Sequence, residues 1–422
     1  MKRNFFLIGS VLVAALFLVG FGVTHIPSFQ SRVNWREEIA LAYLRGMVNP
    51  AGKMPTPLPA PHIEHHQLPS PTPDGSARPD PIQTHTSQPT STATPAPTPT
   101  FPPLPASAKL APPQWEKQDA NNCGPATLSI FLHFYGWTGV QSDINKVIKP
   151  DINDRNVNID ELVYFVRTHA GWLKADYHVG GNEELIKRFI SNGIPFMIEE
   201  TSILNETYWP GDDHWAGHYL LITGYDNNLR SFTVQDSWLG PNLSNSYDLL
   251  DTHWQAFNRA YVLLYRPEQE DLVKRLLGSD WDEAGNRTNA LDSATQETLK
   301  DPRNPYAWFN KGTNLLYFER WSEAAEAYDT ARQIGLPQRM LRYQFGPFIA
   351  YFKTNRIQDL VTLGDYALKI TPNSEEDLLW HGWGVYLQGD KTTAIDNFRT
   401  ALKFNPTYQD AKNALNTLGV SP

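Results

Sequence analysis

The sequence of 422 residues contains a single cysteine, Cys123, so no disulfide can form within the chain. It has no Gly-x-x-x-x-Gly-Lys loop for nucleotide phosphates and no His-Glu-x-x-His pair for zinc. Its formal net charge is -9 and its pI is about 5.7, which argues against a nucleic-acid partner. We therefore expect no metal and no cofactor, and the only thiol becomes the residue to explain.

The N-terminus has the pattern of a membrane segment. Lys2 and Arg3 precede a run from Phe5 to Thr24 that carries no charge. A helix of about 20 apolar residues spans a bilayer, and the preceding positive charges favour a cytoplasmic N-terminus. We expect residues 1–27 to be a single-pass anchor in the cell membrane, with the bulk of the chain extracytoplasmic. The alternative is a cleaved signal peptide, whose apolar core is normally shorter, and cleavage would make the protein secreted.

A proline-rich stretch separates this segment from the rest of the chain. Eighteen of the 33 prolines lie between Pro55 and Pro113, among many Thr, Ser and Ala residues. Such a composition cannot bury a core and favours an extended, polyproline-like chain. We expect residues 54–113 to be a disordered, semi-rigid stalk that holds the following domains away from the membrane. Between anchor and stalk, the juxtamembrane residues 28–53 include an amphipathic helical pattern from Arg32 to Met47.

Residues 114–268 have the mixed pattern of an α+β domain. Apolar residues at helical spacing come first, and short apolar runs typical of strands follow them. Helices followed by antiparallel strands favour an α+β fold. The predicted helices are 127–135, 160–169 and 183–190. The predicted strands are 195–198, 218–223, 232–235 and 261–265, with Asp226-Asn227-Asn228 as a hairpin turn between the second and the third.

Residues 269–422 repeat a helical pattern. A large residue, Gly, Ala, an aromatic residue and Ala recur in that order after 70 residues, as Trp308, Gly312, Ala324, Tyr328, Ala331 and then Leu378, Gly382, Ala394, Phe398, Ala401. This spacing is about twice the 34-residue period of the tetratricopeptide repeat, a pair of antiparallel helices, which the pattern resembles. We expect an all-α repeat domain that binds a protein or peptide partner. The alternative is a helical bundle without repeats.

Cys123 lies in the segment Cys123-Gly-Pro-Ala, directly before the first predicted helix. Pro125 suits a first helical turn, where backbone N–H groups and the helix dipole stabilise a thiolate. Five residues earlier, Gln118 carries an amide that, with the backbone N–H of Cys123, is a candidate donor to an oxyanion. The alternative is a structural role for both residues, since free cysteine is often buried.

His218 begins one predicted strand and Asp236 ends the next. A carboxylate in that position can accept the second imidazole N–H, which fixes the tautomer and stabilises the imidazolium. The order Cys, His, Asp provides what a cysteine nucleophile requires. The alternatives are a structural strand histidine and a turn aspartate.

A polar loop before the strand of His218 contains other candidates for the general base and for a metal site. His214 is the main rival base, and with Asp212 and Asp213 it forms a weak candidate metal site. Large aromatic residues nearby are candidates to line a cleft, although we expect at least one of them to pack in the core: Trp209, Trp215 and Trp238.

Together, Gln118, Cys123-Gly-Pro-Ala, Gly217-His218-Tyr and Asp236 resemble the papain-like cysteine peptidases of the bacteriocin-processing, C39-like kind. Members of that family cleave leader peptides after a double glycine. The resemblance covers about residues 114–266 and implies a papain-like fold that acts on a peptide or protein. It implies that Cys123 is the nucleophile, His218 the general base, Asp236 its orienting partner and Gln118 the oxyanion donor.

The exporter members of that family also carry a multi-helix membrane domain and an ATPase domain. This chain has one long apolar run and no nucleotide-binding loop, so the resemblance implies only the hydrolase core. We thus expect a membrane-anchored, extracytoplasmic cysteine peptidase. Two alternatives remain open: a transglutaminase-like thiol acyltransferase with the same Cys, His and Asp residues, and a catalytically inactive peptidase-like binding protein that acts through its repeats.

Overall fold

The computed structural model describes residues 27–50, 52–58, 103–149, 154 and 156–422. The described residues before Leu58 and after Pro103 belong to one compact unit. The predicted membrane-spanning run from Phe5 to Thr24, and residues 59–102 of the predicted stalk, lie outside the described residues. Within the described ranges, no helix combines the length and the apolar character needed to cross a bilayer.

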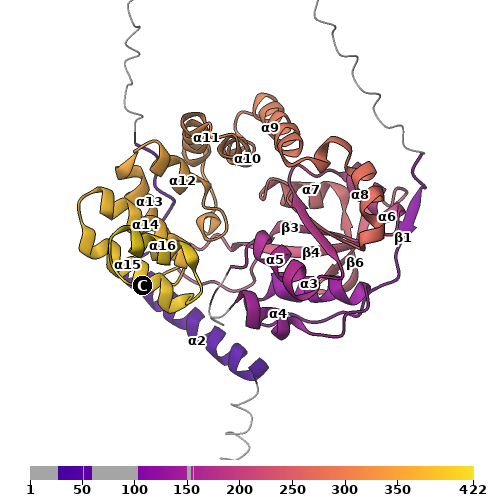
Figure 1. Cartoon of the computed structure of the whole chain (residues 1–422), viewed down its shortest axis with the longest axis horizontal. Helices are drawn as coiled ribbons and strands as arrows, with labels where there is room; N and C mark the ends of the chain where they lie inside the picture. Colours follow the sequence, from indigo (N-terminus) through magenta and orange to yellow (C-terminus); the bar gives the residue numbers. More distant parts are fainter. Residues whose placement is uncertain (1–26, 51, 59–102, 150–153, 155) are drawn as a thin grey trace, which may run out of the picture. The chain divides into compact units, whose positions relative to one another are not determined.

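One antiparallel sheet forms the centre of residues 103–268, called the sheet domain here (Figure 1). Its strands are β1 Ser107–Lys109, β2 Lys174–His178, β3 Phe196–Ile203, β4 Trp215–Asp226, β5 Ser231–Asp236, β6 Gly240–Ser246 and β7 Tyr261–Tyr265. Six of them are neighbours in the order β2-β7-β3-β4-β5-β6, and β1 pairs with β4. The long strand β4 therefore lies between β3 and β5, and side chains from all three can meet.

Helices cover both faces of the sheet. One face carries α3 Cys123–Phe134, α4 Gln141–Ile148 and α5 Ile159–His169, whose apolar residues share a core with Met197, Leu221 and Leu264. The other face carries α6 Glu183–Ser191 and α7 Tyr247–Gln255. There, Phe196 of β3 contacts Phe189 of α6 and Trp254 of α7. Phe196 and Met197 face opposite sides because successive side chains of a strand alternate.

The α+β pattern predicted for the sheet domain is present. The three predicted helices correspond to α3, α5 and α6, and the four predicted strands to β3, β4, β5 and β7. The predicted turn joins β4 to β5, where the Asp226 carboxylate accepts hydrogen bonds from the backbone N–H groups of Asn228 (2.8 Å) and Leu229 (3.2 Å). The sequence pattern does not predict β6, which reads GPNLSNS and becomes a strand through its pairing with β5.

The compact unit extends into both ends of the predicted stalk. β1 pairs with β4 from Ser107 to Lys109, so the sheet domain begins before the predicted boundary at residue 114. At the other end, Met54 is only 7% exposed and packs in the core of the helical region. Proline content suggested that these residues have no partners, but the backbone of β1 and the side chain of Met54 find partners far away in the sequence.

The remaining helices form a helical region over residues 269–422, as predicted for the fold class. They are α8 Glu270–Leu277, α9 Glu283–Lys300, α10 Pro305–Tyr317, α11 Trp321–Ile334, α12 Gly346–Lys353, α13 Ile357–Ile370, α14 Glu375–Leu387, α15 Lys391–Phe404 and α16 Gln409–Thr417. Short 3-10 turns lie at η1 Pro267–Gln269, η2 Gly278–Trp281 and η3 Met340–Arg342. The assignment of this region to the tetratricopeptide family stays a prediction.

Two glycines of the helical region that were predicted to be equivalent make equivalent contacts. A Cβ atom on Gly312 would lie 2.8 Å from the ring of Tyr328, and a Cβ atom on Gly382 would lie 2.5 Å from the ring of Phe398. In both places the helix that carries the glycine packs closely on an aromatic ring of the next helix. Positions 70 residues apart thus have the same role in packing.

The helical region packs directly on the sheet domain. The buried guanidinium of Arg339 donates to both carboxylate oxygens of Asp212, at 2.5 and 2.6 Å. Trp215 of β4 stacks on Phe257 and meets the ring of Tyr343 edge-on. A buried ion pair and an aromatic cluster therefore join the two parts beside β4.

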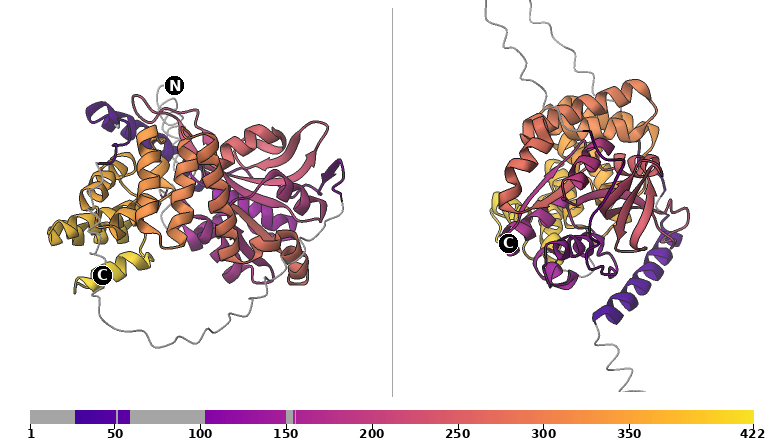
Figure 2. Two further views of the ribbon diagram at one scale, coloured as in Figure 1. Left: turned by 90° about the horizontal axis from the view of Figure 1, so that it is seen from above. Right: turned by 90° about the vertical axis from the view of Figure 1, so that its right-hand side faces the viewer.

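Helix α2 Pro27–Val48 contains the predicted juxtamembrane helix and packs on the same unit (Figure 2). Ile39 and Ala42 contact the core of the helical region. Gly46 lies against the loop after β3, since a Cβ atom there would lie 2.5 Å from the Cβ atom of Trp209. Glycine is therefore needed at residue 46 for this close approach.

Candidate active site

Cys123 is the first residue of α3, and its side chain is partly exposed. The helix can start here because Pro125 fits its first turn and the next residues are apolar and buried against the sheet. Gly124 lies beside β4, where an added Cβ atom would be 3.3 Å from the ring of Tyr219. The thiol therefore lies where the N–H groups that begin a helix favour a negative charge.

His218 and Asp236 meet through the register of β4 and β5. Asp236 pairs with Leu220, two residues along β4 from His218, so both side chains lie on the same face. The His218 Nε2 atom is 3.0 Å from the Asp236 Oδ1 atom, and both side chains are buried. The same Oδ1 atom accepts hydrogen bonds from the backbone N–H groups of Trp238 (2.7 Å) and Leu239 (3.0 Å). Asp236 is thus both the partner of His218 and a turn residue.

Cys123 lies beside His218 in the same pocket. Burial by itself would lower the pKa of His218, but the hydrogen bond and charge of Asp236, together with the nearby Cys123 side chain, raise this pKa to about 10. Burial would likewise raise the pKa of Asp236, yet the hydrogen bond and charge of His218, with two backbone N–H groups, lower it. The carboxylate of Asp236 therefore favours the imidazolium form of His218.

Gln118 lies beside Cys123, and Ser237 sets its orientation. The hydroxyl of Ser237 donates to Gln118 Oε1 at 2.8 Å, and the backbone N–H of Gln118 donates to the carbonyl of Ser237 at 2.9 Å. Because Oε1 is occupied, the amide group available to donate into the pocket is Nε2. This is the orientation that a donor to an oxyanion requires.

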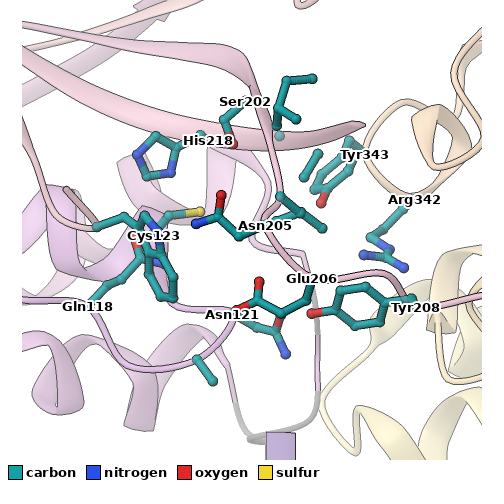
Figure 3. Close-up of a pocket in the computed structure, with 16 residues that line it drawn as sticks. Gln118, Asn121, Cys123, Ser202, Asn205, Glu206, Tyr208, His218, Arg342 and Tyr343 are labelled. Carbon is teal, nitrogen blue, oxygen red and sulfur yellow. The ribbon is translucent and has the colours of Figure 1, made fainter. Parts of the chain in front are cut away.

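Gln118, Cys123 and His218 line a pocket of about 100 Å³ (Figure 3). Figure 3 shows Gln118, Cys123 and His218 together at one end of this pocket, with Arg342 and Tyr343 at the other. The walls between them come from β4 and from the loop after β3, which contributes Leu204 and Tyr208 among others. Arg342 and Tyr343 belong to the helical region, so this region forms one wall of the pocket.

The rival residues of the loop before β4 have other partners. The Nδ1 atom of His214 lies 2.9 Å from the carbonyl oxygen of Leu204 in the same loop. The carboxylates of Asp212 and Asp213 lie 2.5 and 3.6 Å from the guanidinium of Arg339. In the part of the chain that the structure describes, no three His, Cys, Asp or Glu side chains are arranged to hold a metal. The two aspartates position the helical region.

The three candidate tryptophans have different places. Trp238 lines the pocket. Trp209 and Trp215 are 4% and 5% exposed and belong to the core that the helical region shares with the sheet domain. The expectation that at least one of them packs in the core is confirmed, and only Trp238 remains beside the site.

Sequence reasoning misses three residues that support the site. Ser237 orients Gln118, and Trp115 donates its indole N–H to the backbone carbonyl of Asp236 at 2.9 Å. Glu200 lies directly across from His218 in the pairing of β3 with β4. Ser237 had a weak signal, because it directly follows a predicted site residue, whereas Trp115 and Glu200 lie in unrelated segments.

Glu200 places a second carboxyl group beside His218. It is 4% exposed, and its Oε2 atom has no hydrogen-bond partner among the described residues. Burial raises the pKa of Glu200 to about 8, although the charge of His218 lowers it in part. Near neutral pH, Glu200 is therefore mainly an uncharged carboxylic acid next to the imidazole.

All four predicted site residues lie in the sheet domain: Gln118 in the loop before α3, Cys123 at the start of α3, His218 in β4 and Asp236 at the end of β5. Residues 109–268 match the Peptidase_C39 like family model. The match spans the sheet and the pocket residues up to Trp238, and it stops before the helical region. None of the curated proteins compared with the chain matches it. The sheet domain is called the peptidase-like domain from here on.

Solved structures similar to the chain include peptidases. A protein from Bacillus anthracis described as a C39-like peptidase is 13% identical, over 38% of this chain and 98% of that one, with a TM-score of 0.31. The peptidase domain of Streptococcus ComA, a bifunctional ABC transporter, is 14% identical over 37% and 99%, with a TM-score of 0.29. Xylellain, a cysteine protease from Xylella fastidiosa, is 14% identical over 39% and 87%, with a TM-score of 0.31.

Proposed function

We propose that this protein is a cysteine peptidase that hydrolyses peptide bonds with Cys123 as the nucleophile. The observation that supports this most strongly is the position of His218, which is hydrogen-bonded to Asp236 and lies beside Cys123 at the end of a pocket. The match of residues 109–268 to a peptidase family supports the same class of reaction. The substrate is a peptide or a protein.

In the first step, the Cys123 thiolate attacks the carbonyl carbon of the peptide bond and forms an S–C bond. The carbonyl oxygen gains the negative charge and receives hydrogen bonds from Gln118 Nε2 and from the backbone N–H of Cys123. The His218 imidazolium then gives its proton to the nitrogen of the leaving amine, and the C–N bond breaks. The products are a free amine and a thioester on Cys123.

In the second step, the neutral His218 accepts a proton from a water molecule, whose oxygen attacks the thioester carbon. The C–S bond breaks, a carboxylic acid leaves, and the thiolate and imidazolium are restored. Asp236 stays ionised throughout, because its low pKa keeps it as the carboxylate that orients and stabilises the imidazolium. No step requires a metal or a cofactor.

Alkylation by iodoacetamide tests the nucleophile without knowledge of the substrate. We expect rapid labelling of Cys123 in the full chain at pH 7 and slower labelling in His218→Ala, because the imidazolium no longer stabilises the thiolate. His214→Ala is the matched control, since that histidine contacts its own loop, and its labelling rate should equal that of the natural protein. Slow and equal labelling of all three proteins would favour an inactive peptidase-like protein.

Incubation with peptides and amine donors separates hydrolysis from acyl transfer. Hydrolysis releases a new carboxyl terminus, whereas a transglutaminase-like enzyme would attach the added amine to the substrate. Cleavage that is lost in Cys123→Ala supports the proposal. Amine incorporation without net cleavage would assign the acyltransferase alternative.

We also propose that the helical region is a tetratricopeptide-repeat array that presents a protein or peptide partner to the pocket. The equivalent contacts of Gly312 and Gly382 support a repeated unit. The place of Tyr343 in the pocket wall supports a role next to the substrate. Tyr343→Ala should raise KM with little change in kcat, and an unchanged KM would separate the array from substrate binding.

For the location, we propose that residues 1–27 anchor the chain in the cell membrane with the peptidase-like domain outside. The uncharged run from Phe5 to Thr24 after Lys2 and Arg3 supports this orientation. Extraction of membranes at alkaline pH should leave the protein in the pellet. Recovery of a shortened protein from the medium would favour a cleaved signal peptide and a secreted form.

A further inference from the structure

Helix α2 carries an apolar face that no other described element covers. Leu41, Leu44 and Val48 are 52%, 54% and 88% exposed, and they form one stripe at the spacing i, i+3, i+7. Met47 and Tyr43, beside the stripe, are 54% and 40% exposed. Figure 2 shows α2 at the edge of the unit, with one side turned away from the other elements.

The opposite face of α2 is firmly held by the rest of the unit. Ile39 and Ala42 pack on the core of the helical region, and Gly46 contacts Trp209 and Pro210. The helix therefore has no freedom to turn its exposed stripe inward, and a different partner must cover that stripe if it is to leave water.

The segment after α2 is docked as well. The guanidinium of Arg332 donates to the carbonyl of Pro55 at 2.8 Å, and Gln338 Nε2 donates to the carbonyl of Gly52 at 3.1 Å. Met54, between them, is buried in the core of the helical region. These contacts keep α2 close to the unit and prevent it from moving away on a flexible tether.

The chain outside the described structure indicates what covers the stripe. The uncharged run predicted to cross the membrane ends at Thr24, and α2 begins at Pro27. A helix that follows a membrane segment this closely starts at the level of the lipid headgroups. Exposed leucine, valine and methionine side chains suit the boundary between headgroups and acyl chains.

The charges around the stripe fit the same environment. Arg36 and Arg45 are exposed at its margins, where long cationic side chains can reach lipid phosphates. Among the side chains of α2 that the structure describes, the acidic Glu37 is exposed at the N-terminal end of the stripe.

We propose that the exposed face of α2 lies in the membrane interface and holds the peptidase-like domain against the bilayer. This inference reverses the expected role of the proline-rich stretch as a stalk that lifts the domain away. The loop that contacts Gly46 through Trp209 and Pro210 also lines the pocket through Leu204 and Tyr208. If the proposed peptidase activity holds, the substrates are membrane-proximal segments of proteins or peptides at the same membrane.

Spin labels on the full chain in liposomes test the position of α2 independently of catalysis. Cys123→Ala provides a background without thiols, into which Leu44→Cys or Val48→Cys is introduced and labelled. The matched control is Leu299→Cys on α9, since Leu299 is an exposed leucine, 69% accessible, in the helical region. The liposomes contain phosphatidylcholine and phosphatidylglycerol, and collisions with oxygen report lipid while collisions with a water-soluble nickel complex report water.

Labels at residues 44 and 48 should collide more often with oxygen than with the nickel complex, and the label at residue 299 should show the reverse. Equal behaviour of all three labels would overturn the proposal. Low accessibility of residues 44 and 48 to both reagents would show that protein, such as a second copy of the chain, covers α2, and would also overturn it.

A second measurement distinguishes a domain at the membrane from one on a stalk. A donor dye at Ile203→Cys, in the same Cys123→Ala background, marks the rim of the pocket, where Ile203 is 66% exposed. Acceptor dyes on the lipid headgroups should quench this donor strongly. A stalk of residues 54–113 at about 3.1 Å per residue could place the donor beyond transfer range, so absence of quenching would contradict the proposal.

Discussion

Two buried pairs of opposite charge lie beside β4, and they differ in the chemistry of the cation. Arg339 and Asp212 join the helical region to the peptidase-like domain, and both side chains are completely buried. His218 and Asp236 lie at the pocket, where the side chains keep 9% and 8% of their surface exposed. A guanidinium stays charged at all ordinary pH values, whereas an imidazole gains and loses its proton.

This difference separates a structural pair from the pair that we propose to be reactive. Each carboxylate oxygen of Asp212 receives a hydrogen bond from Arg339, and the backbone N–H groups of Tyr208 and His214 donate to the same two oxygens. All of these partners hold the loop before β4 against the helical region. His218 instead is hydrogen-bonded to the carboxylate of Asp236 and lies beside Cys123 in the pocket. In the proposed mechanism its proton passes to a reacting group while the carboxylate remains in place.

Substitution of each cationic residue, His218 and Arg339, is the most stringent test of this comparison. His218→Ala should reduce kcat for peptide hydrolysis by about 10⁶-fold, as loss of a catalytic base does in other triads, with a small effect on stability. Arg339→Met should leave Asp212 buried without its partner and lower the free energy of unfolding by about 3–5 kcal/mol. Urea unfolding and steady-state kinetics on both variants measure the two effects. The comparison fails if Arg339→Met loses activity at full stability.

Substitution of Asp236, the carboxylate partner of His218, should have the next largest effect on kcat. Asp236→Asn cannot stabilise the imidazolium, and we expect kcat to fall by about 10⁴-fold with slower alkylation of Cys123. Asp248→Asn is the control, because Asp248 forms a surface ion pair with Arg230 and its side chain is 85% exposed. Equal activities of the two variants would exclude Asp236 from the mechanism.

Substitution of Gln118, the proposed oxyanion donor, should have the third largest effect on kcat. Gln118→Ala should reduce kcat by about 10²–10³-fold with little change in KM, because the lost hydrogen bond forms fully only in the transition state. Ser237→Ala should give a smaller loss, since Gln118 keeps its amide but loses the hydroxyl that orients it. A change in KM alone for Gln118→Ala would make it a binding residue instead.

The smallest effect concerns Glu200 and pH. Its folded pKa of about 8 lies above the ordinary value of 4.5, so its contribution to stability is complete below pH 4.5 and is lost as pH rises through 8. The natural protein should therefore lose stability relative to Glu200→Gln between pH 5 and 9, at no more than about 1.4 kcal/mol per pH unit. Unfolding midpoints at pH 5, 7 and 9 measure this, and parallel curves would contradict the buried acid.

Much of the peptidase-like domain was predictable because the spacing of apolar residues within short stretches of sequence indicates most of its helices and strands. The apolar spacing after Cys123 predicts α3, and the apolar runs predict β3, β4, β5 and β7. Other elements of the domain were not predicted, namely α4, α7, β1, β2 and β6. β6 is polar and pairs with β5, and β1 lies in a proline-rich stretch and pairs with β4.

The candidate site shows the same division. Cys123, His218 and Asp236 lie at the start or end of predicted elements, so their meeting followed from the order of helix and strands. Ser237 meets Gln118 across 119 residues of sequence, and no local pattern connects the two. Glu200 is a neighbour of His218 because of the register in which β3 pairs with β4, and the sequence does not reveal this register.

By itself, the sequence determined the class of the domain and predicted the candidate catalytic residues within it, because periodicity and turn residues act over a few neighbours. Only the tertiary structure decided that Tyr343 of the helical region lines the pocket and that Arg339 pairs with Asp212, 127 residues away. It also decided that Pro55 docks on Arg332, 277 residues away. The physical reason is that such contacts depend on strand register and helix packing, which no short stretch of sequence encodes.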